Sequence, residues 1–193
     1  DTMKLSEKWS VLAGLRSTTY EQVGYDTTGL QNSTYRKSGV ITPTLALMYK
    51  PAPDTTLYTS YVESLEPGST VSNLYANDGA LLNPLKSRQY ELGVKTERER
   101  WSATAALFRI ERGAEYANSS NVLVQDGQSI YQGLELGAST RLGSQWQIGG
   151  NLMLLDSSYE RGSSYVGNRV AGAPKLVATA QVSYAVAQVP GLK

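Results

Sequence analysis

Apolar and polar residues alternate with a period of two along most of the chain, and this pattern predicts about eight β-strands. The expected strands cover residues 9–20, 38–50, 56–65, 87–97, 101–111, 130–142, 145–156 and 174–185. No segment keeps a helical period for more than a couple of turns. Each expected strand is long enough for a tilted crossing of the hydrocarbon layer, which takes about 9–11 residues.

The connections between these strands alternate between short and long. Residues 51–54, 97–100 and 143–144 form short turns, whereas residues 21–37, 66–86, 112–129 and 157–173 form long polar links. In an up-and-down antiparallel sheet, every second connection lies at the same end. Outer-membrane barrels have this asymmetry, with short periplasmic turns and long extracellular loops. The sequence therefore predicts an all-β, antiparallel, up-and-down transmembrane β-barrel segment of about eight strands.

The alternation gives each expected strand one apolar face and one face of polar, small or charged residues. In strand 87–97, for example, Leu92 and Val94 alternate with Glu91 and Lys95. Charged side chains buried without partners cost several kcal/mol each, so we expect them to line a wet lumen. The expected lumen-wall residues are Arg16, Glu91, Lys95, Glu135 and Arg141. They fit either contact with a plug or a substrate path.

Five aromatic residues share the parity of the apolar rows and stand near the short-turn end. They are Trp9, Tyr49, Trp101, Trp146 and Tyr184. Tyr and Trp rings are enriched at membrane–water interfaces, so this set predicts a membrane girdle. The alternative is that the same rings close the bottom of a soluble barrel.

Composition excludes several functional classes. The 18 Lys and Arg residues nearly balance the 17 Asp and Glu residues, which leaves no cationic footprint for nucleic acid. The chain has no His and no Cys, which excludes Ser-His-Asp and Cys-His catalysis, disulfides and nearly all zinc sites. We expect neither an enzyme, nor a bound metal, nor a cofactor.

Several segments resemble strands of TonB-dependent ferric-siderophore receptors, in the family's order. They are VITPTLALMYKPAPDTTLYTSYVESLEPGS (40–69), NPLKSRQYELGVKTE (83–97), ALFRIERG (106–113), YQGLELGASTRL (131–142) and GNRVAGAPKLVATAQVSY (167–184). The resemblance implies that residues 1–193 are part of the C-terminal β-barrel domain, with the plug domain and further strands absent from this chain. It also implies an outer-membrane location in a Gram-negative bacterium.

The resemblance further implies uptake of a ferric siderophore, energised by the TonB complex through the missing plug, with outer-membrane lipid as the other partner. Candidate ligand-binding residues in the expected long loops are Tyr75, Tyr116, Tyr159, Arg161, Tyr165 and Arg169. Tyr rings offer stacking and a hydroxyl donor, and Arg offers planar, charge-assisted hydrogen bonds to an anionic chelate. The alternative is that Tyr is simply common in polar extracellular loops.

Two other functions fit the same pattern. One is a complete small eight-stranded outer-membrane barrel with a structural or adhesive role, which the strand count allows. The other is a soluble lipocalin-like ligand carrier, which would place the apolar rows inside.

Overall fold

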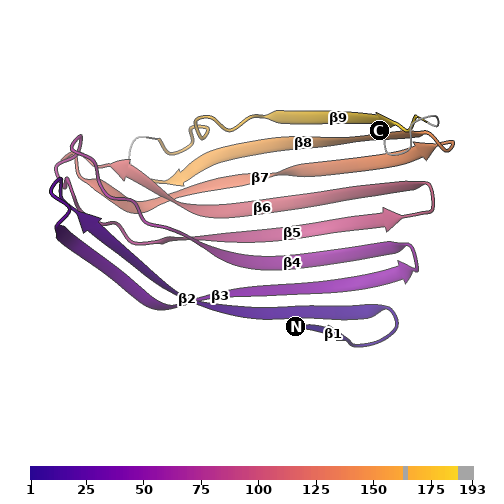
Figure 1. Cartoon of the computed structure of the whole chain (residues 1–193), viewed down its shortest axis with the longest axis horizontal. Coiled ribbons are helices and arrows are strands. Elements are labelled where there is room, and N and C mark those ends of the chain that lie inside the picture. Colours follow the sequence, from indigo (N-terminus) through magenta and orange to yellow (C-terminus); the bar gives the residue numbers. More distant parts are fainter. Residues whose placement is uncertain (163–164, 187–193) are drawn as a thin grey trace.

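The computed structural model describes residues 1–162 and 165–186, which form one antiparallel sheet with nine strands in chain order (Figure 1). The strands are β1 (Thr2–Lys4), β2 (Trp9–Tyr25), β3 (Gln31–Ala52), β4 (Thr55–Glu66), β5 (Leu85–Glu97), β6 (Trp101–Ala117), β7 (Leu123–Leu142), β8 (Trp146–Arg161) and β9 (Leu176–Tyr184). Within these residues, β1 and β9 pair only with β2 and β8, so the sheet is open. The same residues include no helix of the length and apolarity that a membrane crossing needs.

Each strand pairs with the next one along the chain, as the up-and-down prediction requires. The tight turns after β3, β5 and β7 lie together at one end of the sheet, on the right in Figure 1, and the longer connections lie at the opposite end. We call these the tight-turn end and the loop end. The short turns predicted after β3, β5 and β7 are therefore confirmed, whereas only two of the four connections at the loop end, β4 to β5 and β8 to β9, are long.

Two connections expected to be long loops are mostly strand. β2 continues to Tyr25 and β3 begins at Gln31, so only residues 26–30 turn between them. The Asp26 carboxylate closes this turn by accepting hydrogen bonds from Thr28 Oγ1 at 2.6 Å and from the Leu30 N–H at 3.0 Å. The hydrogen bonds from Thr28 and Leu30 lower the pKa of Asp26.

The same error applies to residues 112–129, where β6 runs to Ala117 and β7 begins at Leu123. Alternation fails as a signal in both places because these strand extensions are polar on both faces. The expectation of about eight strands agrees with the nine observed, and the additional strand β1 has only three residues and no alternation of its own. Residues 163–164 of the expected loop 157–173 lie outside the described residues.

The register of the ladder fixes which side chains share a face. Trp9 lies opposite Tyr49, and, on the neighbouring strands, Thr59 lies opposite Leu92. We call the face that carries these four side chains the apolar face, and the opposite one the polar face. A slip by one residue would exchange the two faces along a whole strand.

A one-layer wall has no ordinary core. Val71, Ile130 and Val170 are the buried hydrophobic side chains among the described residues. Large side chains of the apolar face are instead exposed. Leu15, Leu92 and Leu107 expose 79%, 60% and 58% of their surface. In water, so much exposed apolar area would be unfavourable, whereas hydrocarbon is a suitable solvent for it.

Pro43 lies within β3, just before the point where β3 begins to pair with β4. It lies within β3 opposite Leu15 of β2, and the pairing of β3 with β4 begins at the next residue, Thr44. Proline has no N–H to donate and is tolerated where a ladder bond is not required. Pro43 therefore stands at the start of the pairing with β4, although β3 itself begins twelve residues earlier.

Replacement of Gly133 by Ala tests the packing of the ladder itself. A Cβ at Gly133 would lie 2.0 Å from the Leu154 carbonyl oxygen and 3.1 Å from Phe108 Cζ, so backbone must move. We expect G133A to destabilise the fold by about 1–3 kcal/mol. The matched control is Gly14→Ala, because a Cβ there meets nothing closer than Thr44 Cβ at 3.9 Å.

The measurement is the thermal transition of the purified protein, followed by circular dichroism. A lower midpoint for G133A and an unchanged midpoint for G14A are expected. Equal midpoints for both variants would contradict the close approach of β7 and β8 at Gly133.

Candidate functional site

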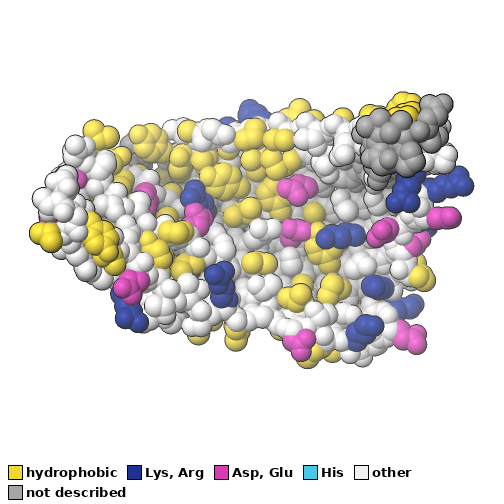
Figure 2. Space-filling model, in the orientation of Figure 1, with side chains coloured by type: hydrophobic (Ala, Val, Ile, Leu, Met, Phe, Trp, Pro, Cys, Tyr) yellow, Lys and Arg dark blue, Asp and Glu magenta, His cyan; other side chains and the backbone are white. Residues whose placement is uncertain are grey.

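The polar face carries the five residues predicted for the lumen wall, and Figure 2 shows acidic and basic side chains spread over one face of the sheet. Glu91 is the centre of a small network on this face. Its carboxylate accepts hydrogen bonds from the Tyr58 hydroxyl and, at 2.9 Å, from Gln89 Nε2. Lys95 Nζ lies 4.9 Å from the centroid of the Tyr58 ring. Tyr58 thus links two of the predicted charges.

Gly93 makes room for this network. A Cβ at Gly93 would lie 2.5 Å from atoms of the Tyr58 ring, so the ring lies flat against the glycine backbone between Glu91 and Lys95. Sequence reasoning missed Tyr58. The signal was a tyrosine facing a glycine across two strands, which appears only when the register of β4 and β5 is known.

Among the described residues, the other three predicted charges make no hydrogen bond to this network. Arg16 lines a separate groove of about 560 Å³ on β2, β3 and β4, together with Gly14, Thr42 and Ser64. Glu135 lies opposite Ala106 of β6, and Arg141 lies opposite Gln147 close to the tight turn after β7. The structure therefore places the five residues on one face without bringing them into one site.

A further ion pair lies on the polar face near the loop end. Arg112 Nε donates to both carboxylate oxygens of Glu66 at 2.8 Å, and its terminal NH2 group also contacts this carboxylate. Such a multidentate pair fixes the guanidinium more firmly than a single contact does. The sequence analysis did not single out either residue, because their strands are separated in the chain by β5.

Of the six candidate ligand residues, four lie around the end of β8. The Tyr159 and Tyr165 rings have centroids 6.0 Å apart, and Tyr116 lies beside Gly162, the residue that follows Arg161. The Asp126 carboxylate near the Tyr116 hydroxyl raises the pKa of Tyr116. Arg161 Nε donates to Gln128 Oε1 at 3.0 Å.

The remaining two candidates have different surroundings. Arg169 donates to the carbonyl oxygens of Ala173, at 3.0 Å, and Leu155, at 3.3 Å, so its guanidinium ties the 165–175 segment to β8. Tyr75 lies apart in the connection between β4 and β5, next to Ala76, whose N–H donates to the Asn121 carbonyl at 2.8 Å.

The connection between β4 and β5, residues 67–84, is held on both sides by side-chain amides. Asn77 accepts from the Leu123 N–H at 2.9 Å and donates to the Leu123 carbonyl at 3.1 Å. Gln125 makes the same double contact with the backbone of Asn83, at 2.9 and 2.7 Å. The 67–84 connection is therefore fixed to β7 by side-chain amides, without the backbone hydrogen bonds that join neighbouring strands.

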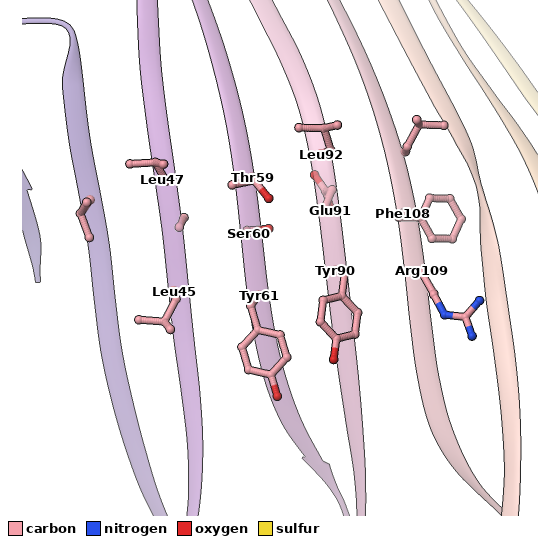
Figure 3. Close-up of a pocket in the computed structure, with 13 residues that line it drawn as sticks. Leu45, Leu47, Thr59, Ser60, Tyr61, Tyr90, Glu91, Leu92, Phe108 and Arg109 are labelled. Carbon is pink, nitrogen blue, oxygen red and sulfur yellow. The ribbon is translucent and has the colours of Figure 1, made fainter.

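The predicted girdle residues lie on the apolar face at the tight-turn end. Trp9 and Tyr49 pack with ring centroids 4.6 Å apart, as do Trp146 and Tyr184. Trp101 begins β6 at the same end, with the Arg98 guanidinium 5.6 Å from its ring. A third aromatic pair, Tyr61 and Tyr90 with ring centroids 5.2 Å apart, lies on the same face nearer the loop end (Figure 3).

Residues 1–192 match the family model described as "TonB dependent receptor-like, beta-barrel". The chain belongs to this family. Its members are receptors and transporters of the Gram-negative outer membrane rather than enzymes, and the expected fold class, location and non-enzymatic role are confirmed. Within the described residues no three His, Cys, Asp or Glu side chains form a group that could hold a metal ion.

Individual relatives agree with this family. The probable TonB-dependent receptor BfrD of Bordetella pertussis is 30% identical over 177 residues, covering 84% of this chain and 24% of that protein. The probable TonB-dependent siderophore receptor PiuA of Acinetobacter baumannii is 25% identical over 211 residues, covering 96% and 28%. The ferric yersiniabactin uptake receptor FyuA of Yersinia pestis superposes with a TM-score of 0.75 at 22% identity, over 94% and 29%. The chain thus spans about a quarter of the length of its curated relatives.

Replacement of Asn77 by Ala tests the fixed loop. The change removes two hydrogen bonds to the Leu123 backbone, a loss of about 1–3 kcal/mol locally. We expect the backbone amides of residues 76–82 to exchange with deuterium roughly tenfold faster or more in the variant protein. Asn73→Ala is the control, because Asn73 is exposed in the same loop and makes no side-chain hydrogen bond among the described residues. Equal exchange in both variants would contradict the anchoring role of Asn77.

Proposed function

We propose that the protein is an outer-membrane receptor that takes up ferric siderophores, with energy supplied through TonB. The observation that carries the proposal is a two-faced strand array in a chain that belongs to the TonB-dependent receptor family. A sequence relative over 96% of this chain is named as a siderophore receptor. The parts that would meet TonB are proposed to lie in other regions of the receptor.

The proposal includes an orientation for the wall. The apolar face contacts hydrocarbon, and the five aromatic side chains at the tight-turn end mark the periplasmic boundary. The polar face lines the interior, where Glu91, Lys95 and the Glu66–Arg112 pair stay hydrated or contact a plug. Charges cost little in such a wet lumen, whereas the same charges would be expensive against lipid.

The ligand is proposed to bind at the loop end, on the side of the polar face. Tyr159 shares this face with Ser129, its partner in β7, and its ring lies close to Tyr165. Two neighbouring phenol rings offer stacking surface and hydroxyl donors to a bulky ferric chelate. Arg161 lies opposite Gln128 of β7, just beyond the register shift that follows the Ser129–Tyr159 pair. We propose that its guanidinium makes a charged contact with the ligand at the edge of the sheet.

Uptake of iron tests the function. A strain without other iron receptors should grow under iron limitation on a panel of ferric hydroxamate and catecholate siderophores when it expresses the full-length receptor. Growth should be lost when tonB is deleted. Tyr159→Ala should weaken binding of the growth-supporting chelate about tenfold, because an aromatic contact to a charged or polar ligand is worth roughly 1–2 kcal/mol.

The control is Tyr25→Ala, because Tyr25 is an exposed tyrosine at the tip of the separate β2–β3 hairpin. Both variants should reach the membrane in equal amounts. Growth on no ferric chelate, or growth that persists without TonB, would contradict the proposed function. Unchanged affinity in Tyr159→Ala would contradict only the placement of the ligand.

A further inference from the structure

Two strand pairs extend beyond the rest of the sheet at the loop end (Figure 1). We call residues 20–37 of β2 and β3 the first hairpin, and residues 113–128 of β6 and β7 the second hairpin. β3 pairs with β4 only from Thr44 onward, and β6 pairs with β5 only up to Arg112. β4 and β5 lie between the two hairpins, so within the described sheet no strand ladder joins them.

The 67–84 connection, which leads from β4 to β5, is closed by contacts between its own two arms. Thr70 in the first arm forms an antiparallel bridge with Leu81 in the second arm. A Cβ at Gly68 would lie 1.9 Å from the Leu82 carbonyl oxygen, so the two arms are in close contact. The side chain of Val71 is only 2% exposed. The connection is therefore a folded unit, and a displacement of one arm also displaces the other.

The first arm bonds to both hairpins through two neighbouring residues. Thr70 Oγ1 accepts a hydrogen bond from Gln22 Nε2 of the first hairpin at 2.8 Å. Ser69 Oγ donates to Glu115 Oε2 of the second hairpin at 3.1 Å. Residues 69 and 70 thus link two strands, β2 and β6, that are not neighbours in the sheet.

The second arm repeats this double attachment at a single residue, Asn83. The Tyr35 hydroxyl of the first hairpin donates to Asn83 Oδ1 at 2.6 Å. The backbone N–H and carbonyl of the same residue bond to the side-chain amide of Gln125 in the second hairpin. Asn83 is therefore held from one side through its side chain and from the other side through its backbone.

Within each hairpin, the side chains that contact the connection also contact each other. The Tyr20 hydroxyl donates to Gln22 Oε1 at 2.6 Å, and the Tyr20 and Tyr35 ring centroids are 6.1 Å apart. In the second hairpin, Gln125 Nε2 donates to Glu115 Oε1 at 3.0 Å. The two attachment points on each hairpin are thus linked, and the connection and both hairpins form one continuous network.

We infer that residues 67–84 are a brace that couples the first hairpin to the second, so that the two hairpins move as one body. Each arm bonds to both hairpins, and the arms are held together by their own backbone. A contact that displaces the second hairpin at Tyr116, or the brace at Tyr75, therefore also displaces the first hairpin. The inference concerns the loop end alone and does not rest on the proposed uptake function.

The competing interpretation is a connection anchored to the second hairpin only. The paired contacts of Asn77 and Gln125 would be enough for such an anchor. The hydrogen bonds from Gln22 and Tyr35 would then have no mechanical consequence. The two interpretations differ in whether a change on one side of the connection alters motion on the other side.

The test is the distance between the two hairpin tips, measured by double electron–electron resonance on the purified protein. Nitroxides are attached to the substitutions T27C and S119C, which lie in the exposed turns of the first and second hairpins. The chain has no cysteine that would take up a third label. We expect one narrow distance distribution, because the brace fixes the two tips relative to each other.

Two variants release the brace from opposite sides. Q22A/Y35F removes its side-chain bonds to the first hairpin, and N77A/Q125A removes the paired amide contacts with the second. We expect both variants to widen the distribution at least about twofold, because a brace fails when either side is released. Y35F alone, which removes one oxygen atom, should widen it in the same direction.

A remote readout separates coupling from local loosening. N77A/Q125A changes no residue that contacts the first hairpin, yet the amides of residues 33–37 should exchange with deuterium at least about threefold faster. The control is Y25F/N73A, which removes a hydroxyl and an amide from exposed residues of the first hairpin and the brace. It should match the wild type in both measurements.

A broad distribution in the wild-type protein would overturn the brace. Widening in N77A/Q125A but not in Q22A/Y35F would show an anchor on the second hairpin only and would overturn it as well, as would unchanged exchange at residues 33–37. Neither readout depends on transport, so failure of siderophore uptake would leave the result intact.

Discussion

The structure depends on one constraint, which is that a single hydrogen-bonded ladder must separate two different solvents. Each strand satisfies its backbone groups through its neighbours, so the side chains alone decide what each face of the wall meets. Because side chains alternate, register and solvent are coupled, and a slip of one residue would place Glu91 where Leu92 lies. The exposure of Leu15 and Leu107 is then a requirement of the fold rather than a defect.

The two ends of the sheet are stabilised in different ways. At the tight-turn end the strands reverse quickly, and aromatic pairs such as Trp9–Tyr49 cover the ladder. At the loop end the strands continue beyond the apolar side chains. There, hydrogen bonds from polar side chains stabilise the strands and their connections. Asn77 and Gln125 hold the 67–84 connection there through paired contacts to backbone, which gives this connection a defined position against β7.

Much of this architecture could be predicted from the sequence. In segments such as 87–97, apolar and polar residues alternate, which is typical of a strand with one apolar and one polar face. Strand extensions around Tyr25 and Ala117 could not, since their side chains are polar on both faces and carry no periodic signal. Tyr58 escaped notice because its partner across the strands depends on register. Lys86 and Arg88, which pair with Glu63, were missed for a different reason, because they share the parity of Leu92 and Val94 and so fall on the face predicted to be apolar.

The most direct test of the two-solvent wall is a spin-label scan of β5. Single cysteines at residues 89–96 of the protein, each carrying a nitroxide, report collision rates with lipid-soluble oxygen and with a water-soluble nickel chelate. This chain contains no cysteine of its own to interfere. The account predicts a period of two, with oxygen favoured at residues 92 and 94 and the nickel chelate favoured at residues 91 and 95. The opposite phase, or no alternation, would contradict it.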